Sequence, residues 1–319
     1  MWGSGMNKFS KVARSIRAFA REISRPSVTP SLNPVPTKRP TIGIALGGGF
    51  ARGLAHVGIL KVFEQENIPI DFIAGTSVGS VIGAAYCSGI SAKELEEIAG
   101  LVRFKHFARW TISRYGIASN DRMTGFLQKV LKVRTFEELK IPLAVAATDF
   151  VSGDPVVFRS GPLIDPVRAS CSYPGMFLPV NIGGKLLVDG MLGHAVPTIP
   201  LREMGADRVV GVYLSAHWVN LKGPRHVFDV VGQCFSIAQQ KMCGLWEGAA
   251  DMVLTPDVRG FSYDGFERAS ELIAAGEKVA RTALPQIKEW LAASEPLSQK
   301  VVVRAPLSAP AQPTVAYPR

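Results

Sequence analysis

Two glycine-rich turns, each lying between a short apolar segment and a helix-like segment, constrain most strongly what this chain can fold into. The first turn joins Thr41–Leu46 to Leu54–Glu66, and the second follows Ile70–Ala74. Short apolar runs bounded by glycine are typical of buried strands. Further strands are expected at Leu143–Ala147, Leu186–Val188, Arg208–Leu214 and Asp251–Leu254, and helices at about 93–103, 121–131, 197–204, 226–243 and 264–291.

This alternation predicts an α/β fold with a mainly parallel central sheet covered by helices on both faces. In such sheets, ligands bind at the carboxyl ends of the strands. Both glycine-rich turns fall at strand ends, so we expect the functional site at that edge of the sheet.

The composition excludes several other classes of protein. With 47% hydrophobic and 19% charged residues, the 319-residue chain is neither a disordered protein nor a coiled coil. Its four cysteines form no C-x-x-C pair and have no histidine pair nearby, so neither a disulfide framework nor a zinc site is expected. This pattern predicts a reducing compartment and a cytoplasmic protein. No cofactor is expected.

The net charge of +10 is concentrated at the N-terminus. Residues 1–40 hold eight basic residues and one acidic residue, a net of +7, which leaves +3 for the rest of the chain. A nucleic-acid-binding protein would carry basic residues in a recognisable module of the fold itself, and none is present in the sequence. We therefore expect no nucleic-acid partner.

The N-terminal arm has a helical pattern. Phe9, Val12, Ile16, Phe19 and Ile23 share one helical face, and most of the basic residues lie off it. A basic amphipathic helix of this kind is typical of peripheral contact with an anionic membrane surface, here the inner face of the membrane. The alternatives are a helix that packs on the body, a partner-binding helix and an organelle-targeting peptide.

These patterns divide the chain into three parts. Residues 24–40 contain five prolines and are expected to be a linker, so the helix and linker together span 1–40. Residues 304–319 are rich in proline and alanine and are expected to be a disordered tail. The folded body is then 41–303, as a single α/β domain.

One uncharged segment is long enough to span a membrane. Phe72–Ala92 holds 21 residues without charge, but nine of them are Gly, Ser or Thr. The segment also contains the second glycine-rich turn, and Ser91 and Glu94 then form a capping-box pattern that starts a new helix. We therefore interpret it as a buried strand, a tight turn and a buried helix.

The first turn contains Gly47, Gly48 and Gly49 in succession, followed by Phe50-Ala51-Arg52-Gly53. Successive glycines allow close backbone approach, and N–H groups beside a helix N-terminus favour negative charge. A dinucleotide-binding G-x-G-x-x-G would need glycine at Arg52, and the Gly-Lys-Ser/Thr ending of a P-loop is missing. An oxyanion hole fits better; a purely structural turn is the alternative.

The second turn, Gly75-Thr76-Ser77-Val78-Gly79, is a G-x-S-x-G sequence between an apolar strand and a helix of small residues. This context is that of a nucleophile elbow, in which the serine hydroxyl is exposed on a sharp turn and Gly75 and Gly79 avoid clashes. The alternative is a buried serine that caps the helix.

An acid follows another expected strand. Lys185-Leu186-Leu187-Val188-Asp189-Gly190 places Asp189 where an apolar run ends. Asp-Gly alone is often only a turn. Taken singly, Asp189 is weak evidence for a catalytic base.

The three motifs together, in this order and spacing, resemble those of the patatin-like phospholipase family, and in particular its bacterial members. The resemblance covers most of 41–260 and includes Ala147-Thr148-Asp149, the run Ala169 to Pro179, and Met204 to Asp207. Two departures lie beside the acid: Met191 stands where the family often has a small residue, and Gly193 to Pro197 lacks the usual asparagine.

The resemblance implies a serine acyl-ester hydrolase that acts on phospholipids or lysophospholipids. It makes Ser77 the nucleophile and Asp189 its partner in a Ser–Asp dyad, with Gly47, Gly48 and Gly49 as an oxyanion loop supported by Arg52. Reaction through an acyl-enzyme requires no metal. Head group, chain length and oligomeric state are not indicated.

Two other functions stay open at this point. An α/β-hydrolase esterase would complete a triad with a late histidine, for which His194, His217 and His226 are the candidates. A non-catalytic lipid-binding protein on the same fold would keep the pocket without the chemistry.

Overall fold

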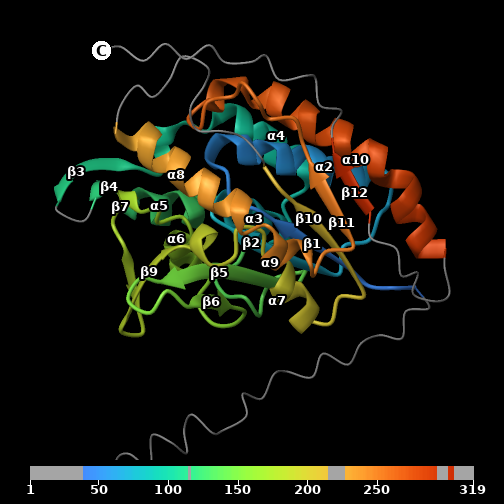
Figure 1. Cartoon of the computed structure of the whole chain (residues 1–319), viewed down its shortest axis with the longest axis horizontal. Helices are drawn as coiled ribbons and strands as arrows, with labels where there is room; N and C mark the ends of the chain where they lie inside the picture. The colour runs from blue at the N-terminus through green and yellow to red at the C-terminus, as the bar shows by residue number, and fades with distance from the viewer. Residues whose placement is uncertain (1–38, 114–115, 215–226, 293–300, 305–319) are drawn as a thin grey trace, which may run out of the picture. The chain divides into compact units, whose positions relative to one another are not determined.

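The computed structural model describes residues 39–113, 116–214, 227–292 and 301–304. The basic helix expected near the N-terminus, most of the linker and all of the C-terminal tail except Arg304, which ends a strand, lie outside the described residues, so the boundaries of these parts remain predictions. Figure 1 shows the arrangement of the helices and strands along the described chain.

Twelve strands form two sheets in the described residues. The strands are β1 (Ile42–Leu46), β2 (Phe72–Thr76), β3 (Arg109–Ser113), β4 (Gly116–Ser119), β5 (Leu143–Asp149), β6 (Pro155–Phe158), β7 (Gly175–Phe177), β8 (Val180–Ile182), β9 (Lys185–Asp189), β10 (Arg208–Val212), β11 (Met252–Thr255) and β12 (Val301–Arg304).

The helices are α2 (Ala55–Gln65), α3 (Val78–Cys87), α4 (Ala92–Leu101), α5 (Asp121–Val130), α6 (Ile164–Ser170), α7 (Thr198–Glu203), α8 (Val227–Lys241), α9 (Gly244–Glu247) and α10 (Ala269–Ala292). Short 3-10 helices lie at Phe50–Leu54, Phe104–His106, Gly190–Leu192 and Phe266–Arg268.

The large sheet has the strand order β12-β11-β10-β1-β2-β5-β9-β8, and β6 pairs with β5. From β12 to β5 every neighbouring pair is parallel, whereas β9, β8 and β6 are antiparallel to their neighbours. The expected α/β fold with a mainly parallel central sheet is therefore confirmed. A small second sheet joins β3, β4 and β7.

Side-chain alternation along the strands explains the two helical layers. In β1, Ile42, Ile44 and Leu46 contribute to the larger core, which includes α2, α3, α4 and α10, while Ala45 contributes to a smaller core under α7 and α9. Because both faces of the central strands are covered by apolar side chains, β1 is buried throughout. Figure 1 shows α2, α4 and α10 on one side of the sheet and α7 on the other.

The close packing of α2 against α10 depends on two glycines. A Cβ on Gly58 would lie 2.0 Å from the Ile273 carbonyl oxygen, and a Cβ on Gly276 would lie 1.9 Å from that of Ala55. The two helix backbones therefore touch, which holds α2, and the glycine-rich loop before it, firmly on the sheet.

The uncharged segment Phe72–Ala92 forms β2, α3 and the connection to α4, as the sequence predicts. The capping box is present: Ser91 Oγ accepts from the Glu94 N–H, and the Glu94 carboxylate accepts from the Ser91 N–H. Among the described helices, none is long and apolar enough to cross a membrane.

Candidate active site

Ser77 occupies a strained turn between β2, which ends at Thr76, and α3, which begins at Val78. Its φ of 54° and ψ of −127° place a non-glycine residue in a rarely populated region of backbone space. A Cβ on Gly79 would lie 2.1 Å from the Leu46 carbonyl oxygen, and one on Gly75 would lie 2.5 Å from the Ser80 Cα. Both flanking positions therefore accommodate glycine only.

The register of the sheet brings Asp189 to Ser77. Thr76 in β2 is paired with Ala146 in β5, and Ala147 is paired with Asp189 in β9. β9 is antiparallel to β5, but Asp189 is its last residue and still lies level with the serine turn. The Ser77 Oγ donates to Asp189 Oδ2 at 2.8 Å, and both residues are buried.

The environment of Asp189 changes its acidity. Burial raises the pKa of the carboxyl group from about 3.8 to about 7, while the Met191 N–H and the Ser77 hydroxyl, which both donate to the carboxylate, oppose the rise. The Met191 N–H reaches Asp189 Oδ1 at 2.9 Å, so each carboxylate oxygen has a defined donor. A carboxyl group with a pKa near neutrality can act as a base and as an acid.

The backbone of Ser77 is held by two other serines that the sequence analysis did not single out as site residues. The Ser77 N–H donates to Ser170 Oγ at 2.8 Å, and the Ser170 hydroxyl donates to the Ala146 carbonyl oxygen at 2.6 Å. The Ser77 carbonyl oxygen accepts from the Ser80 hydroxyl at 2.6 Å. Ser170 is fully buried at the end of α6, but that helix also carries Asp165 and Arg168, so a serine does not stand out in its local sequence.

The glycine loop lies against the serine. A Cβ on Gly48 would lie 3.3 Å from Ser77 Cβ and 2.4 Å from the Met191 side chain, so Met191 narrows this side of the site. The Gly47 N–H donates to the Val212 carbonyl oxygen at 3.1 Å and the Gly48 N–H to that of Ala195 at 3.3 Å. In the described part of the chain, the Gly49 N–H has no hydrogen-bond acceptor.

Two charged or titratable side chains brace the loop from outside the site. His56 is fully buried in α2, and its Nε2 lies 2.8 Å from the Gly47 carbonyl oxygen. Burial lowers the pKa of His56 to about 4, so the ring is neutral and its Nε2–H is the donor. Arg52, expected to support the loop, donates from Nε to the Phe261 carbonyl oxygen at 3.0 Å, and burial lowers its pKa to about 10.

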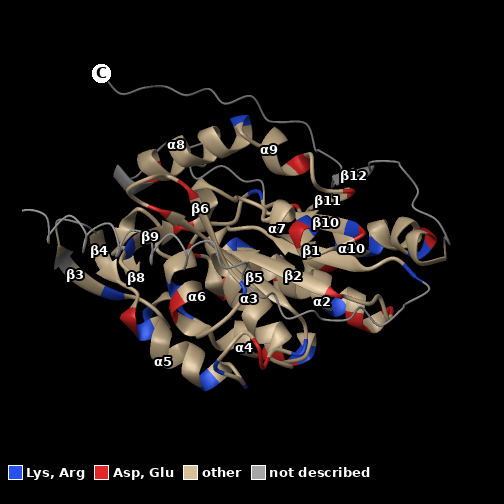
Figure 2. Ribbon diagram, turned by 90° about the horizontal axis from the view of Figure 1, so that it is seen from below, with Lys and Arg blue, Asp and Glu red and all other residues tan. Residues whose placement is uncertain are grey.

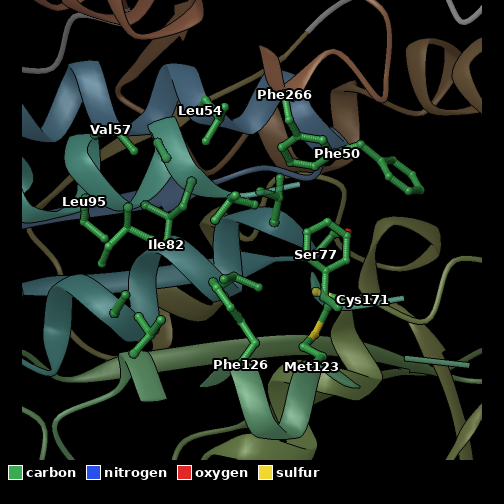
Figure 3. Close-up of a pocket in the computed structure, with 18 of the residues that line it drawn as sticks. Phe50, Leu54, Val57, Ser77, Ile82, Leu95, Met123, Phe126, Cys171 and Phe266 are labelled. Carbon is green, nitrogen blue, oxygen red and sulfur yellow. The ribbon is translucent and has the colours of Figure 1, made fainter. Parts of the chain in front are cut away.

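An apolar pocket opens beside the serine. Its volume is about 110 Å³, and Ser77 provides the one hydroxyl group of its lining. In Figure 3, Ser77 lies near Cys171 toward one end, and Val57 and Leu95 lie at the other. The other lining residues come mainly from α3, α4, α5 and aromatic positions: Phe50, Leu54, Val57, Val78, Val81, Ile82, Ala85, Leu95, Ile98, Ala99, Val102, Phe107, Met123, Phe126, Val130, Cys171, Phe177 and Phe266.

Among the described residues, no histidine side chain hydrogen-bonds with Ser77 or Asp189. The His194 carbonyl oxygen accepts from the Thr76 hydroxyl at 2.7 Å, and burial lowers the pKa of the His194 ring. His217 and His226 lie outside the described residues. No group of three or more His, Cys, Asp or Glu side chains in the described ranges is placed to hold a metal ion.

Comparison with known proteins assigns this part of the chain to a family. The family model described as Patatin-like phospholipase matches residues 44–202, a range that contains the glycine loop, Ser77 and Asp189. The chain belongs to the patatin-like phospholipase family.

Several relatives match part of this chain. An NTE family protein of Mycobacterium tuberculosis is 30% identical over 191 residues, covering 55% of this chain and 49% of the relative. Patatin-like phospholipase domain-containing protein 6 of Homo sapiens is 32% identical over 209 residues, covering 61% and 15%. Lysophospholipase NTE1 of Mycosarcoma maydis is 29% identical over 231 residues, covering 69% and 12%. The patatin-like chain described here thus spans about half the length of the mycobacterial relative and a small part of the other two.

Solved structures match this chain with low sequence identity and with TM-scores below 0.5. VipD from Legionella pneumophila matches with a TM-score of 0.48 and 13% identity, over 78% of this chain and 67% of that chain. ExoU in its complex with SpcU from Pseudomonas aeruginosa matches with a TM-score of 0.42 and 15% identity, over 81% and 53%. At these TM-scores the likeness adds nothing to the family assignment.

Proposed function

We propose that this chain is a serine acyl-ester hydrolase that acts on phospholipids or lysophospholipids through a Ser77–Asp189 dyad. The observation that carries the proposal is the 2.8 Å hydrogen bond from the Ser77 hydroxyl to a buried carboxylate, beside an apolar pocket. The family assignment and the presence of a lysophospholipase among the relatives support a lipid ester as the substrate.

In the proposed reaction, Ser77 Oγ attacks the ester carbonyl carbon while its proton passes to Asp189 Oδ2. Collapse of the tetrahedral intermediate breaks the bond to the leaving alcohol, which takes the proton from Asp189. Water then attacks the acyl-enzyme, gives its proton to Asp189 and releases the fatty acid, and Ser77 recovers its proton. A carboxyl pKa of about 7 suits both directions of transfer near neutral pH.

The negative charge of the intermediate needs donors near Ser77. The N–H groups of Gly47 and Gly48 are engaged with backbone oxygens, which leaves Gly49 as the best-placed donor of the predicted oxyanion loop. Val78 is the first residue of α3, where helix N–H groups have no partner within the helix and the dipole favours an anion. We assign the oxyanion to these two N–H groups; losing one such donor typically costs about 3–4 kcal/mol.

The pocket supports an acyl chain rather than a polar group as the part of the substrate next to Ser77. Its lining residues are apolar apart from the serine, so an alkyl chain loses no hydrogen bonds on entering it. An ester at Ser77 would then direct its alcohol portion away from the pocket, toward solvent.

A fluorophosphonate probe tests this function directly. It forms a covalent bond with an activated serine, so we expect it to label the wild type and not Ser77→Ala. Ser88→Ala is the matched control, because Ser88 is a buried serine that follows α3 and bonds with Ala85 instead of the site. Labelling of Ser77→Ala equal to that of the wild type would reject Ser77 as the nucleophile, whereas a wild type that the probe does not label would favour a non-catalytic lipid-binding protein.

A further inference from the structure

Helix α8 has an unusual distribution of polar and apolar side chains. Two of its polar residues, Asp229 and Gln239, are buried, with 2% and 8% exposure, whereas Gln240 and Lys241 at its C-terminal end are exposed. Large apolar side chains of α8 are open to solvent, namely Val230 (47%), Val231 (36%) and Ile237 (47%), and exposed apolar positions continue with Met242 (43%) after α8 and Leu245 (71%) in α9. A helix on the surface of a water-soluble domain normally has the reverse pattern.

The buried face of α8 lies over the catalytic edge. Gln239 Nε2 donates to the Met191 carbonyl oxygen at 3.2 Å, two residues beyond Asp189. Phe235 packs edge-on against Tyr173, with ring centroids 5.6 Å apart. The helix is therefore attached to the segments that carry the proposed base, and its apolar face points away from them.

Charge distinguishes this face from the other exposed helices. Between Val230 and Leu245, Lys241 is the one charged residue, and Asp229 before it is buried. In Figure 2, α8 is almost entirely tan, whereas α4, α5 and α10 carry red and blue along their lengths. Such a face presents no carboxylate to an anionic layer and offers it one cation.

We propose that the apolar surface formed by Val230, Val231 and Ile237 of α8, Met242 directly after it and Leu245 of α9 inserts into the interface of a lipid bilayer. Contiguous exposed apolar surface marks an interaction site, and an apolar helix face with a flanking lysine suits the boundary between headgroups and acyl chains. The inference rests on the proposed lipid-ester hydrolysis, because insertion of α8 would bring the covered dyad next to the lipid.

The test compares binding to vesicles of neutral phosphatidylcholine at about 0.5 M salt, where attraction between exposed charges is largely screened. We expect the combined variant Val231→Gln, Ile237→Gln, Leu245→Gln to bind at least about tenfold more weakly than the wild type. Ala274→Gln, at an exposed position of α10, is the control and should bind like the wild type. Hydrolysis of a soluble ester should stay within about twofold in both variants, because the changed side chains face away from the site.

Two outcomes would overturn the proposal. One is unchanged vesicle binding by the combined variant. The other is a wild type that sediments as a dimer and a combined variant that sediments as a monomer, with the same vesicle binding in both. This result would make the face a contact between two copies of the chain. Failure of the proposed function is a separate result, since it would appear as a wild type that binds vesicles but hydrolyses no ester.

Discussion

The backbone N–H of Ser77 donates to the Oγ of Ser170 at 2.8 Å, and the Ser170 hydroxyl continues to Ala146 in the neighbouring strand at 2.6 Å. The strained serine turn is thereby tied to β5, which also pairs with the strand that carries Asp189. One side chain thus fixes the distance between the two members of the proposed dyad. It also removes the N–H of Ser77 itself from the set of oxyanion donors.

Replacing Ser170 should therefore reduce activity by more than its effect on stability explains. Ser170→Ala leaves the buried Ser77 N–H without an acceptor, at a cost of about 1–3 kcal/mol. Because the serine turn loses its anchor, we also expect kcat to fall by about 10- to 100-fold. The measurement is kcat on a soluble chromogenic ester, together with thermal melts.

Ser88→Ala is the control for this prediction. Ser88 is also buried and its hydroxyl donates to Ala85 at 2.7 Å, so its loss should lower the melting temperature and spare kcat. Equal effects of the two variants on kcat would contradict an anchoring role for Ser170.

Replacement by alanine should affect two glycines differently: Gly79→Ala should lower stability, and Gly48→Ala should lower activity. In Gly79→Ala the new methyl group meets the Leu46 carbonyl oxygen at 2.1 Å, and backbone cannot move aside. We expect a loss of about 3 kcal/mol or more in the free energy of unfolding. In Gly48→Ala the methyl meets the flexible Met191 side chain at 2.4 Å, which can turn away, but it stays 3.3 Å from Ser77 Cβ. This variant should fold and lose about 100-fold in kcat/KM.

Denaturant unfolding and ester kinetics on both glycine variants check this contrast. A Gly48→Ala enzyme with full activity would show that the loop does not border the reacting ester. A fully stable Gly79→Ala would contradict the packing of α3 on β1.

The motifs could be predicted because they follow short, continuous apolar runs. The runs that form β1, β2, β5, β10 and β11 are recognisable as buried strands from their length and their flanking glycine or polar residues. The antiparallel direction of β9 could not be predicted, since Lys185–Asp189 is a short apolar run and direction depends on its partner β5. β6, β7 and β8, with three or four residues each, were also not predicted, because so short a strand has no measurable period.

The site was predicted only where a motif marked it. The sequence pointed to Ser77, Asp189 and the glycine loop, but the roles of Ser170 and His56 depend on contacts between distant segments. The sequence also did not show that Gly47 and Gly48 use their N–H groups within the fold, which shifts the proposed oxyanion donors to Gly49 and Val78. Hydrogen-bond partners of a loop are a property of its neighbours, so local sequence does not determine them.

The pH dependence of catalysis should reflect Asp189. The base must be ionised to accept the serine proton, so kcat/KM for an uncharged ester should rise about tenfold per pH unit below a pKa of about 7 and level off above it. A profile that stays flat down to pH 5 would show that the carboxyl group ionises normally.

The same shift predicts a stability effect with a defined sign. The folded protein holds the Asp189 proton up to about pH 7, whereas the unfolded chain releases it near 3.8, so this group stabilises the fold at low pH and the contribution is lost as pH rises through 7. Asp189→Asn should therefore be more stable than the wild type at pH 8, by a few kcal/mol, and gain little at pH 4. His56 has a lowered pKa, which changes stability with pH in the opposite direction. Because the wild type and Asp189→Asn both contain His56, its effect drops out of the difference between them.

The basic N-terminal segment should act separately from α8. Residues 1–37 can be removed while keeping Arg39, whose guanidinium donates to both oxygens of Asp71 at 2.9 and 3.0 Å. Each base near an anionic surface adds about 1 kcal/mol of attraction, so truncation should weaken binding to anionic vesicles at low salt and spare soluble-ester hydrolysis. Undiminished binding by the truncated chain would assign the predicted N-terminal helix to another role.

The dyad is tested most directly by kcat/KM on one soluble ester for Ser77→Ala, Asp189→Asn and the single variants His194→Ala, His217→Ala and His226→Ala, each shown to be folded by thermal melting. We predict that the first two lose at least about 1,000-fold, because the nucleophile or its base is gone. Each histidine variant should stay within about tenfold of the wild type, a disturbance of about 1.4 kcal/mol. A folded histidine variant as inactive as Ser77→Ala would contradict the dyad and establish a triad in its place.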